Sequence, residues 1–212
     1  MLNLILMREG NLNILLGGPA GAGIEKSGKT LTLSFVRAGY FVFANVEHMS
    51  QIRHGNNFLR LRIDEKSHES HVEEIDVMVA LDKTTIEEHL NEMNEGGVII
   101  FDNEVVNLEK GFDSGKATLV GVPLKKLAKE KLENPVMANV ISLGIICRIA
   151  DFDVEILKKV LGKVFAKKGE EIISLNEKAA DLGFELGEKW AEKFPVKMPA
   201  KKAEPHMFLM GN

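Results

Sequence analysis

Residues 12–30, LNILLGGPAGAGIEKSGKT, run from an apolar segment through a set of glycines into a segment with helical spacing. The apolar residues 12–16 suit a short buried strand. A glycine loop between a strand and a helix brings backbone N–H groups, backed by the helix dipole, toward a phosphate. The stretch therefore predicts a phosphate-binding loop, and the purely structural alternative is a close strand-to-helix turn. The residues expected to form this loop, neither helix nor strand, are Gly17, Gly18, Pro19, Gly21 and Gly23.

The same stretch satisfies the phosphate-loop pattern G-x-x-x-x-G-K-S/T, because residues 23–30 read GIEKSGKT. Residues 98–102, VIIFD, resemble the apolar strand with a terminal Asp that helps such nucleotidases to hold magnesium. The spacing argues against this interpretation, since six residues (GGPAGA) separate the apolar run from the first glycine of the pattern. A helix over about residues 22–38 would place Gly28–Thr30 inside it, with their N–H groups committed to the backbone. An ATPase or GTPase stays as the alternative function.

The composition is that of an ordinary chain with no redox centre of its own. Of the 212 residues, 45% are apolar and 27% are charged, which suits one domain with a sizeable core, and the net charge of −4 does not favour nucleic acid. The single cysteine, Cys147, lies in an apolar run and alone can form neither an internal disulfide nor a zinc or iron–sulfur site. No apolar stretch is long enough to span a membrane, so a cytoplasmic protein is predicted.

Residues 64–74, DEKSHESHVEE, carry two histidines, His68 and His71, among several glutamates. Such side chains can bind a metal ion, but no metal-binding template has this spacing and the segment lacks apolar periodicity. A solvated loop is predicted here, and no metal site.

Strands and helices alternate through the first part of the chain. The strand–helix–strand unit at residues 12–46 implies a right-handed crossover, so the sheet is expected to begin parallel. The alternation predicts an α/β fold with three layers, in which a mainly parallel sheet carries helices on both faces. After the first strand, the predicted strands cover residues 40–46, 57–63, 75–81, 98–101 and 116–122.

Two capping boxes, in which Ser or Thr is followed three residues later by Glu, predict helix starts. Thr84–Glu87 is expected to open a short helix that Gly96 and Gly97 end, and Ser174–Glu177 is expected to open the last helix.

From Pro123 onward the spacing is helical, so the C-terminal part of the chain is predicted to be helical, with Asp153 as a further helix cap. The last helix carries small residues, including Gly183 and Gly187, on one side. They predict that another element approaches this helix closely.

Ligands of open α/β sheets bind outside the carboxyl ends of the strands. The glycine loop and the polar connector at residues 47–57, EHMSQIRHGNN, both follow predicted strands at their carboxyl ends. We therefore expect the loop and the connector to face one another.

Several stretches are similar, in the order in which they occur, to the gamma domain of 2-oxoacid:ferredoxin oxidoreductases. They are GGPAGAGIEKSG, RAGYFVF, SQIRHGNNFLRLRI, VGVPLKKLAKE, NPVMANVISLG and NEKAADLGFELG, and they span roughly residues 12–190. In many family members this gamma domain is fused ahead of an alpha domain, and Met210–Asn212 resembles the opening of one. The resemblance implies a gamma domain at residues 1–194, with a fold like domain III of pyruvate:ferredoxin oxidoreductase. A linker and the start of a truncated alpha domain would follow at residues 195–212.

The resemblance implies a component of an enzyme. The family decarboxylates a 2-oxoacid (pyruvate, 2-oxoglutarate or ketoisovalerate) oxidatively with coenzyme A, giving an acyl-CoA, carbon dioxide and reduced ferredoxin. Thiamine diphosphate, magnesium and iron–sulfur clusters serve that chemistry and are expected on alpha and beta partners, not on this chain. The chain itself would be a non-catalytic gamma component that helps to bind coenzyme A. It would belong to a hetero-oligomer, or form a homodimer in isolation, with ferredoxin as an indirect partner.

The resemblance assigns this chain no catalytic residue and no metal ligand, but it suggests where coenzyme A lies. In the connector, Arg53 would offer a forked contact to phosphate, or alternatively a surface or inter-subunit ion pair. Lys26 is a weaker candidate, since a helix lysine is often only solvated. The backbone N–H groups expected to face the phosphates or the partner are those of Gly18, Gly21, Ala22 and Gly23. The residues expected to shape the connector are Ser50, His54, Gly55 and Asn56, and the family often has glycine where His54 stands.

Overall fold

The computed structural model describes residues 7–48 and 56–199. Strands alternate with helices as far as residue 122, and helices dominate from there to residue 191. In chain order the elements are β1 Arg8–Glu9, β2 Asn11–Pro19, α1 Ile24–Arg37, β3 Phe41–His48, β4 Asn56–Asp64, β5 Ile75–Ala80, α2 Lys83–His89, η2 Leu90–Glu92, β6 Met93–Asp102, β7 Thr118–Val122, α3 Leu124–Leu132, η3 Pro135–Met137, α4 Ala138–Ile149, α5 Val154–Val164, η4 Ala166–Lys168, α6 Glu170–Ala191 and β8 Val196–Lys197.

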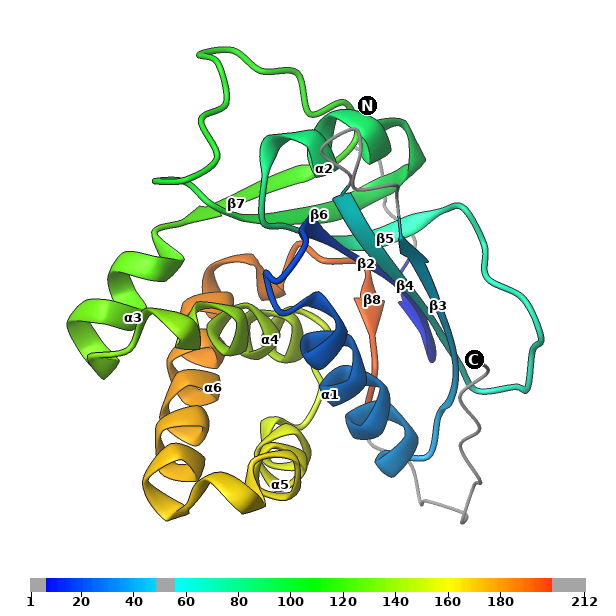
Figure 1. Cartoon of the computed structure of the whole chain (residues 1–212). Helices are drawn as coiled ribbons and strands as arrows, with labels where there is room; N and C mark the ends of the chain where they lie inside the picture. Colours follow the sequence, from blue (N-terminus) through cyan, green and yellow to red (C-terminus); the bar gives the residue numbers. More distant parts are fainter. Residues whose placement is uncertain (1–6, 49–55, 200–212) are drawn as a thin grey trace.

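Six strands form one sheet in the order β3-β4-β2-β5-β6-β7 (Figure 1). β2, β5, β6 and β7 pair in parallel, whereas β4 lies antiparallel between β3 and β2. The predicted α/β fold with a mainly parallel sheet is confirmed. β2 and β3 run in the same direction, as the crossover argument predicts, but they are not neighbours because β4 folds back between them.

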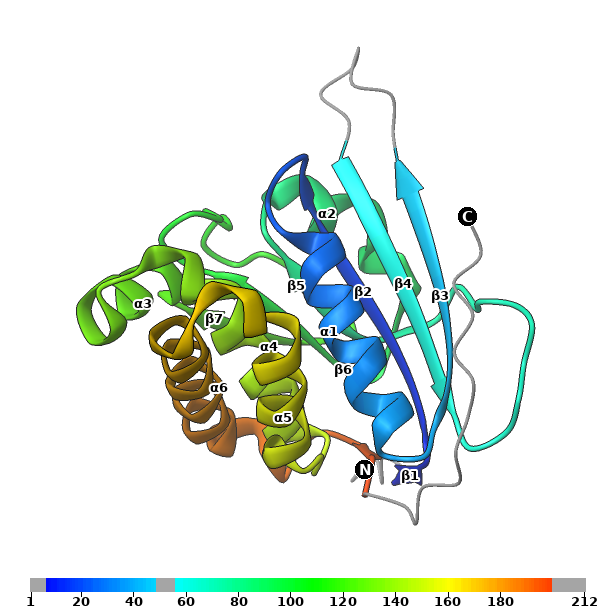
Figure 2. The ribbon, with the colours of Figure 1, turned by 60° about the horizontal axis from the view of Figure 1, so that its bottom comes forward.

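Successive residues of β2 serve two separate cores, because side chains along a strand point alternately to opposite faces. Leu12, Ile14 and Leu16 join the core beneath α1 and α3–α6, while Leu15 joins a smaller core with Ile86 of α2. Figures 1 and 2 show α2 on the side of the sheet opposite to α1, α4, α5 and α6. The predicted three layers are therefore present, with a thick helical layer on one face and a thin one on the other.

α4 and α6 pack with their backbones nearly in contact. A Cβ atom added at Gly183 would lie 2.0 Å from the carbonyl oxygen of Ile141, and one at Gly144 would lie 2.2 Å from that of Ala180. No methyl group fits at such distances, so each helix needs glycine where it crosses the other. The close approach that the small residues of the last helix predict is confirmed.

Glycines lie inside two strands that the sequence pattern made too short, at the end of β2 and at the beginning of β6. β2 runs on through Gly17 and Gly18 and pairs there with β4, so the prediction that these glycines exclude a strand is wrong. A Cβ at Gly17 would lie 2.4 Å from Cγ2 of Thr85, so glycine here lets α2 approach the strand. Gly96 and Gly97, expected to end a helix, lie inside β6, where a Cβ at Gly97 would lie 2.8 Å from Cε of Met93 and 3.0 Å from the carbonyl oxygen of Asn94.

Both predicted capping boxes are displaced from the true helix starts. The N-cap of α2 is Asp82, whose Oδ1 accepts hydrogen bonds from the N–H (2.9 Å) and the hydroxyl (2.7 Å) of Thr85. Ser174 lies inside α6, which begins after Gly169. In both cases a residue further upstream takes the non-helical conformation that a cap requires, and the box pattern alone cannot choose between them. The predicted cap of α5, Asp153, is confirmed.

The last described residues pack back onto the domain. β8 pairs in parallel with β1, and Phe194, Val196 and Met198 are fully buried. Residues as far as Met198 thus belong to the same globular unit, while residues 200–212 lie outside the described part of the chain. The domain boundary and the alpha-like ending stay predictions. In the described ranges, no helix combines the length and apolar character that spanning a bilayer requires.

Gly183→Ala is expected to lower the free energy of unfolding by about 2–4 kcal/mol, because the added methyl group meets backbone atoms that can move only if the two helices separate. Urea unfolding followed by circular dichroism measures this. The matched control is Gly162→Ala in α5, where the nearest atom to the new Cβ is Cγ2 of Ile173 at 3.8 Å. That change should be neutral or stabilising by up to about 1 kcal/mol. Equal effects of the two substitutions would contradict the tight packing of α4 on α6.

Candidate functional site

The carboxyl ends of β2 and β5 lie side by side, and the chain leaves these two strands toward opposite faces of the sheet, into α1 and α2. Such a switch point is the usual ligand-binding edge of an open α/β sheet. The ends of the connector lie at the same edge, since Asn57 is opposite Gly18 on one side and His48 on the other. The prediction that the glycine loop and the connector face one another is confirmed for the residues where the connector joins the strands.

The loop between β2 and α1 is a tight turn tied to α4. The N–H of Ala22 donates to the Pro19 carbonyl at 3.1 Å, and Gly21 and Gly23 have φ angles of 82° and 86°, in the region that favours glycine. Asn139 of α4 donates its Nδ2 to the Ala22 carbonyl at 2.7 Å. A Cβ at Gly23 would lie 2.7 Å from that same nitrogen. Backbone conformation and the contact with α4 therefore both require glycine at position 23.

The donors available to an anion differ from those expected. The N–H of Ala22 closes the turn, so the prediction that it faces a phosphate is corrected, and Gly18 is buried within β2. The first helical hydrogen bond of α1 runs from the N–H of Ser27 to the carbonyl of Gly23 (3.0 Å). The N–H groups of residues 24–26 precede this bond and have no partner within the helix. No side chain from the described ranges caps this helix end. The anion-attracting part of the edge is thus the first turn of α1.

A groove of about 310 Å³ opens beside this turn. The loop and the first turn of α1 form one wall, and Val46 of β3 with Asn57 and Phe58 of β4 form the other. Among the described residues, two charged side chains line it, Glu25 and Lys26. The groove combines a helix N-terminus with a lysine, which attract an anion, and with a glutamate, which opposes one.

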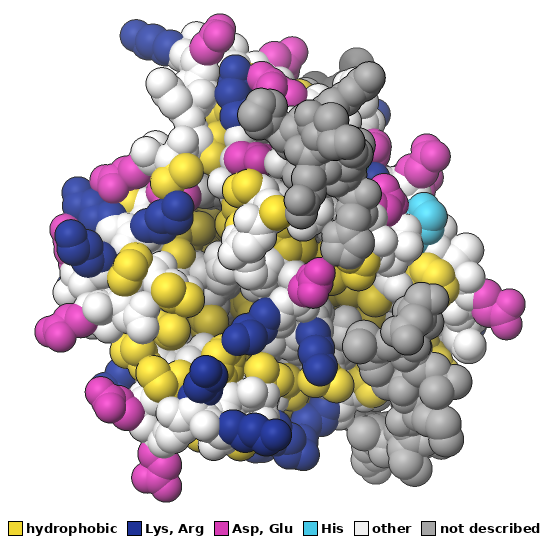
Figure 3. Space-filling model, in the orientation of Figure 1, with side chains coloured by type: hydrophobic (Ala, Val, Ile, Leu, Met, Phe, Trp, Pro, Cys, Tyr) yellow, Lys and Arg dark blue, Asp and Glu magenta, His cyan; other side chains and the backbone are white. Residues whose placement is uncertain are grey.

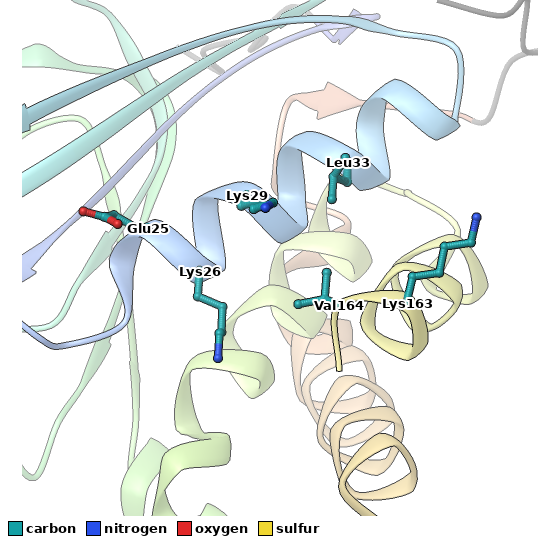
Figure 4. Close-up of a pocket in the computed structure, with 6 residues that line it drawn as sticks. All are labelled: Glu25, Lys26, Lys29, Leu33, Lys163 and Val164. Carbon is teal, nitrogen blue, oxygen red and sulfur yellow. The ribbon is translucent and has the colours of Figure 1, made fainter. Parts of the chain in front are cut away.

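A second and more open groove, of about 580 Å³, lies between α1 and α5 (Figure 4). Lys26, Lys29 and Lys163 line it, and Leu33 and Val164 face one another between the two helices. Figure 3 shows Lys and Arg side chains gathered on this side of the molecule, close to exposed hydrophobic atoms. Glu25 also lines this groove, which therefore shares Glu25 and Lys26 with the groove at the switch point. Its lysines are exposed, and the rest of its lining comes from the helical layer.

Asn56 anchors the end of the connector. Its side chain is 5% exposed and donates its amide to Oδ1 of Asp82 at 3.1 Å, the same oxygen that caps α2. Asn56 therefore holds β4 to the start of α2. The other connector residues singled out from the sequence lie outside the described residues, and their roles stay predictions: Ser50, Arg53, His54 and Gly55.

The phosphate-loop pattern is accounted for by packing. Its GKT triplet lies within α1, as the spacing predicts. A Cβ at Gly28 would lie 2.3 Å from Cδ1 of Leu59, so this glycine lets α1 approach β4. The buried hydroxyl of Thr30 donates to the Lys26 carbonyl at 2.8 Å. A phosphate loop needs these residues outside the helical ladder, so the geometry gives the nucleotidase interpretation no support.

The described residues offer neither a metal-binding cluster nor a reactive thiol. No group of three His, Cys, Asp or Glu side chains there is placed to hold a metal ion. The two ring nitrogens of His68 lie 3.0 and 3.1 Å from the backbone oxygens of Lys66 and Arg62. Cys147 is 1% exposed, and burial raises the pKa of its thiol far above the ordinary value, so it presents no reactive thiolate.

Two asparagines near the loop were missed by the sequence analysis. Asn139 holds the loop, as described above. Asn176 of α6 is fully buried beside a third hollow, and its Oδ1 has no hydrogen-bond partner among the described residues. In the sequence, each of these asparagines is only an amide within an otherwise apolar stripe of a helix. Many helices contain such an amide, so the pattern does not identify a functional residue.

Residues 13–186 match the protein family described as pyruvate ferredoxin/flavodoxin oxidoreductase. The alpha subunit of 2-oxoacid:ferredoxin oxidoreductase 2 from Aeropyrum pernix is 25% identical over 209 residues, which covers 80% of this chain and 32% of that subunit. The 2-oxoglutarate synthase subunit KorC from Archaeoglobus fulgidus is 23% identical over 179 residues, covering 84% of this chain and 89% of KorC. The chain thus spans about a third of the length of the alpha subunit that it matches.

Solved structures show the same fold. The 2-oxoglutarate:ferredoxin oxidoreductase from Magnetococcus marinus, solved with 2-oxoglutarate, coenzyme A and succinyl-CoA bound, superposes with a TM-score of 0.79 at 23% identity and covers 89% of this chain and 33% of its own. The gamma subunit of a keto/oxoacid ferredoxin oxidoreductase from Geobacter sulfurreducens superposes with a TM-score of 0.69 at 20% identity, covering 83% and 98%.

Asn139→Ala is expected to loosen the glycine loop without unfolding the chain. Loss of the hydrogen bond to the Ala22 carbonyl should speed amide hydrogen exchange in the loop and the first turn of α1 by about tenfold, as measured by mass spectrometry. Asn134→Ala serves as the control, because Asn134 caps η3 nearby through Val136 and does not touch the loop. Unchanged exchange in the loop of the Asn139 variant, or an equal change in both variants, would show that Asn139 does not hold the loop.

Proposed function

The chain belongs to the pyruvate ferredoxin/flavodoxin oxidoreductase family, and we propose that it is the non-catalytic gamma component of a cytoplasmic 2-oxoacid:ferredoxin oxidoreductase. In this role it helps to bind coenzyme A while its partners convert a 2-oxoacid to an acyl-CoA, carbon dioxide and reduced ferredoxin. Thiamine diphosphate with magnesium, and iron–sulfur clusters, belong to the alpha and beta partners and supply the electron-sink and electron-transfer chemistry there.

The lengths of the relatives support a gamma role. The region of similarity is about a third of the Aeropyrum alpha subunit but 89% of KorC and 98% of the Geobacter gamma subunit. This region therefore exists elsewhere as a separate chain, and elsewhere as one part of a longer one. The Magnetococcus enzyme, which contains a unit of this fold, was solved with coenzyme A bound, and this supports coenzyme A as the ligand.

The observation that carries the proposal is the N-terminus of α1, which no side chain of the described ranges caps, beside a groove at the switch point of the sheet. Backbone N–H groups and the helix dipole attract phosphate there. Lys26 adds a cation whose Nζ is held 4.8 Å from the ring centroid of Phe165. The groove of about 310 Å³ lies at the small end of the range for ligand pockets, so it would hold part of coenzyme A and leave the rest to a partner.

The candidate residues other than Gly18 and Ala22 each have a role in this proposal. Gly21 and Gly23 allow the tight turn of the loop, which leaves the first turn of α1 open to a phosphate. Lys26 supplies a positive charge beside it. Arg53 supplies a second, forked cation from the connector. Asn56 fixes one end of that connector, and Ser50, His54 and Gly55 shape the rest of it. Val46, which is 41% exposed, lies on the wall of the groove.

Purification of the chain from its native source is expected to bring down alpha and beta partners. Cofactor analysis of that complex should find thiamine diphosphate and iron, and the complex should reduce ferredoxin with a 2-oxoacid only when coenzyme A is present. Intact mass of the chain within the complex would show whether it continues into an alpha domain. A chain that purifies alone and binds ATP with magnesium would overturn the proposal.

Removing the positive charge of the groove is expected to lower the affinity for coenzyme A, and removing its negative charge is expected to raise that affinity. Lys26→Ala should weaken binding about three- to tenfold, and Glu25→Gln should strengthen it about two- to threefold, because a phosphate gains or loses one neighbouring charge. Both effects should shrink as salt is added, measured by isothermal titration of the complex. Lys131→Ala on α3 is the control, since it removes one positive charge far from the groove. If the Lys26 and Lys131 variants bound coenzyme A with equal affinity, coenzyme A would not bind in this groove.

A further inference from the structure

The open groove of about 580 Å³ between α1 and α5 has an apolar centre and a basic rim (Figure 4). Leu33 of α1 and Val164 of α5 are half-buried and face one another across it. Lys26, Lys29 and Lys163 line the groove and are exposed. Coenzyme A binding at the switch point uses Lys26 and leaves the rest of this groove without a role.

One face of α1 supplies a row of cations to this groove. Residues 26, 29, 33 and 37 are three or four positions apart, so Lys26, Lys29, Leu33 and Arg37 lie along a single stripe of the helix. Arg37 is exposed like the two lysines. From residue 26 to residue 37 the helix rises about 16 Å. The stripe is therefore long, and it is basic on either side of an apolar residue.

The helix across the groove continues this charge. Lys163 lines the groove from α5, and Lys167 and Lys168 follow in η4, all three exposed. Glu170 and Glu171 come next, at the start of α6. Because these two carboxylates offset the charge of η4, the surplus of positive charge belongs to Lys163 and to the stripe on α1.

The described part of the chain does not neutralise that surplus. Lys29, Arg37 and Lys163 form no ion pair with a carboxylate of the described residues. Glu25 is the one acidic residue among those described as lining the groove. The groove is thus basic although the whole chain has a net charge of −4.

The spread of these cations favours a protein partner over a small anion. A phosphate group is bound by donors that converge on one point, whereas Lys29, Lys163 and Arg37 are distributed around an apolar centre. A groove that is apolar at its centre accepts the apolar face of an amphipathic helix. A nucleic acid fits less well, since its backbone offers nothing apolar to pack on Leu33 and Val164. The complementary partner is a helix with carboxylates on both sides of an apolar stripe.

We propose that the groove between α1 and α5 docks an acidic amphipathic helix of a partner subunit of the same oxidoreductase. The proposal rests on the proposed function and adds where on this chain a partner binds. Apolar side chains of the docked helix contact Leu33 and Val164, and its carboxylates pair with Lys29, Lys163 and Arg37. Glu25 and Lys26 line both this groove and the one at the switch point. The docked helix therefore lies beside the coenzyme A site.

Carbodiimide cross-linking of the complex purified from the native source tests the contact directly. The reagent joins a lysine amine to a carboxylate only where the two side chains touch, and mass spectrometry identifies the joined peptides. Lys29 and Lys163 are expected to be joined to Asp or Glu residues of a partner subunit. Lys129 and Lys131 of α3, which are also exposed, serve as the control and should not be joined to that subunit.

Charge reversal tests the energetic role of the lysines in the full chain. The double variant Lys29→Glu with Lys163→Glu should raise the dissociation constant for assembly with the partner subunits at least tenfold at physiological salt. Assembly of wild type should weaken as salt is added, and assembly of the double variant should weaken less. The matched control is Lys129→Glu with Lys131→Glu, which changes the same charge on another exposed helix face. Urea unfolding should be alike for both double variants.

Leu33→Ala tests the apolar centre. The half-buried leucine contributes no charge, so this change should weaken assembly about three- to tenfold without altering its salt dependence. Unchanged assembly of the Leu33 variant, together with a loss on charge reversal, would mean that the groove attracts a polyanion such as nucleic acid and not an amphipathic helix.

Failure of the docking proposal differs from failure of the proposed function. If the complex forms and binds coenzyme A, but Lys29 and Lys163 are not cross-linked and their reversal acts like the control, the function stands and the docking site is wrong. The docking site is also wrong if the reversal leaves assembly intact and weakens coenzyme A instead, since the groove would then belong to the coenzyme A site. A chain that purifies without alpha and beta partners overturns both proposals.

Discussion

The backbone contact between α4 and α6 fixes the helical layer on which the candidate site depends. Gly144 and Gly183 let the two helices meet at distances that no side chain allows. α4 is thereby held in one position, and its Asn139 reaches the Ala22 carbonyl, 117 residues away in sequence. The loop at the end of β2 thus takes its shape from a contact made on the far side of the helical layer.

The antiparallel strand β4 determines which segments meet at the ligand-binding edge of the sheet. By folding back between β3 and β2, it places both ends of the connector next to the glycine loop. Asp82 then joins this edge to the opposite layer, because one of its oxygens caps α2 and also accepts from Asn56. The glycine loop, the ends of the connector and the start of α2, which are distant in the chain, therefore meet at this edge of the sheet.

Much of the fold could be predicted because helical and strand periodicities are local properties of a sequence. The strand over residues 75–81 and the cap at Asp153 appear where their patterns place them. The errors concern glycine and caps. Gly17 looks like a strand breaker until Thr85 is seen to occupy the space of its missing side chain. Such contacts depend on residues far along the chain, and no local pattern encodes them.

By itself the sequence determined the α/β class, the glycine loop after the first strand, the helical position of the GKT triplet and the resemblance to the oxidoreductase family, because each depends on neighbouring residues or on an ordered set of motifs. Only the tertiary structure decided that the N–H of Ala22 is used within the turn and that Asn139 holds the loop. The reason is physical: hydrogen-bond partners and cavities are made by segments that meet only after the chain has folded.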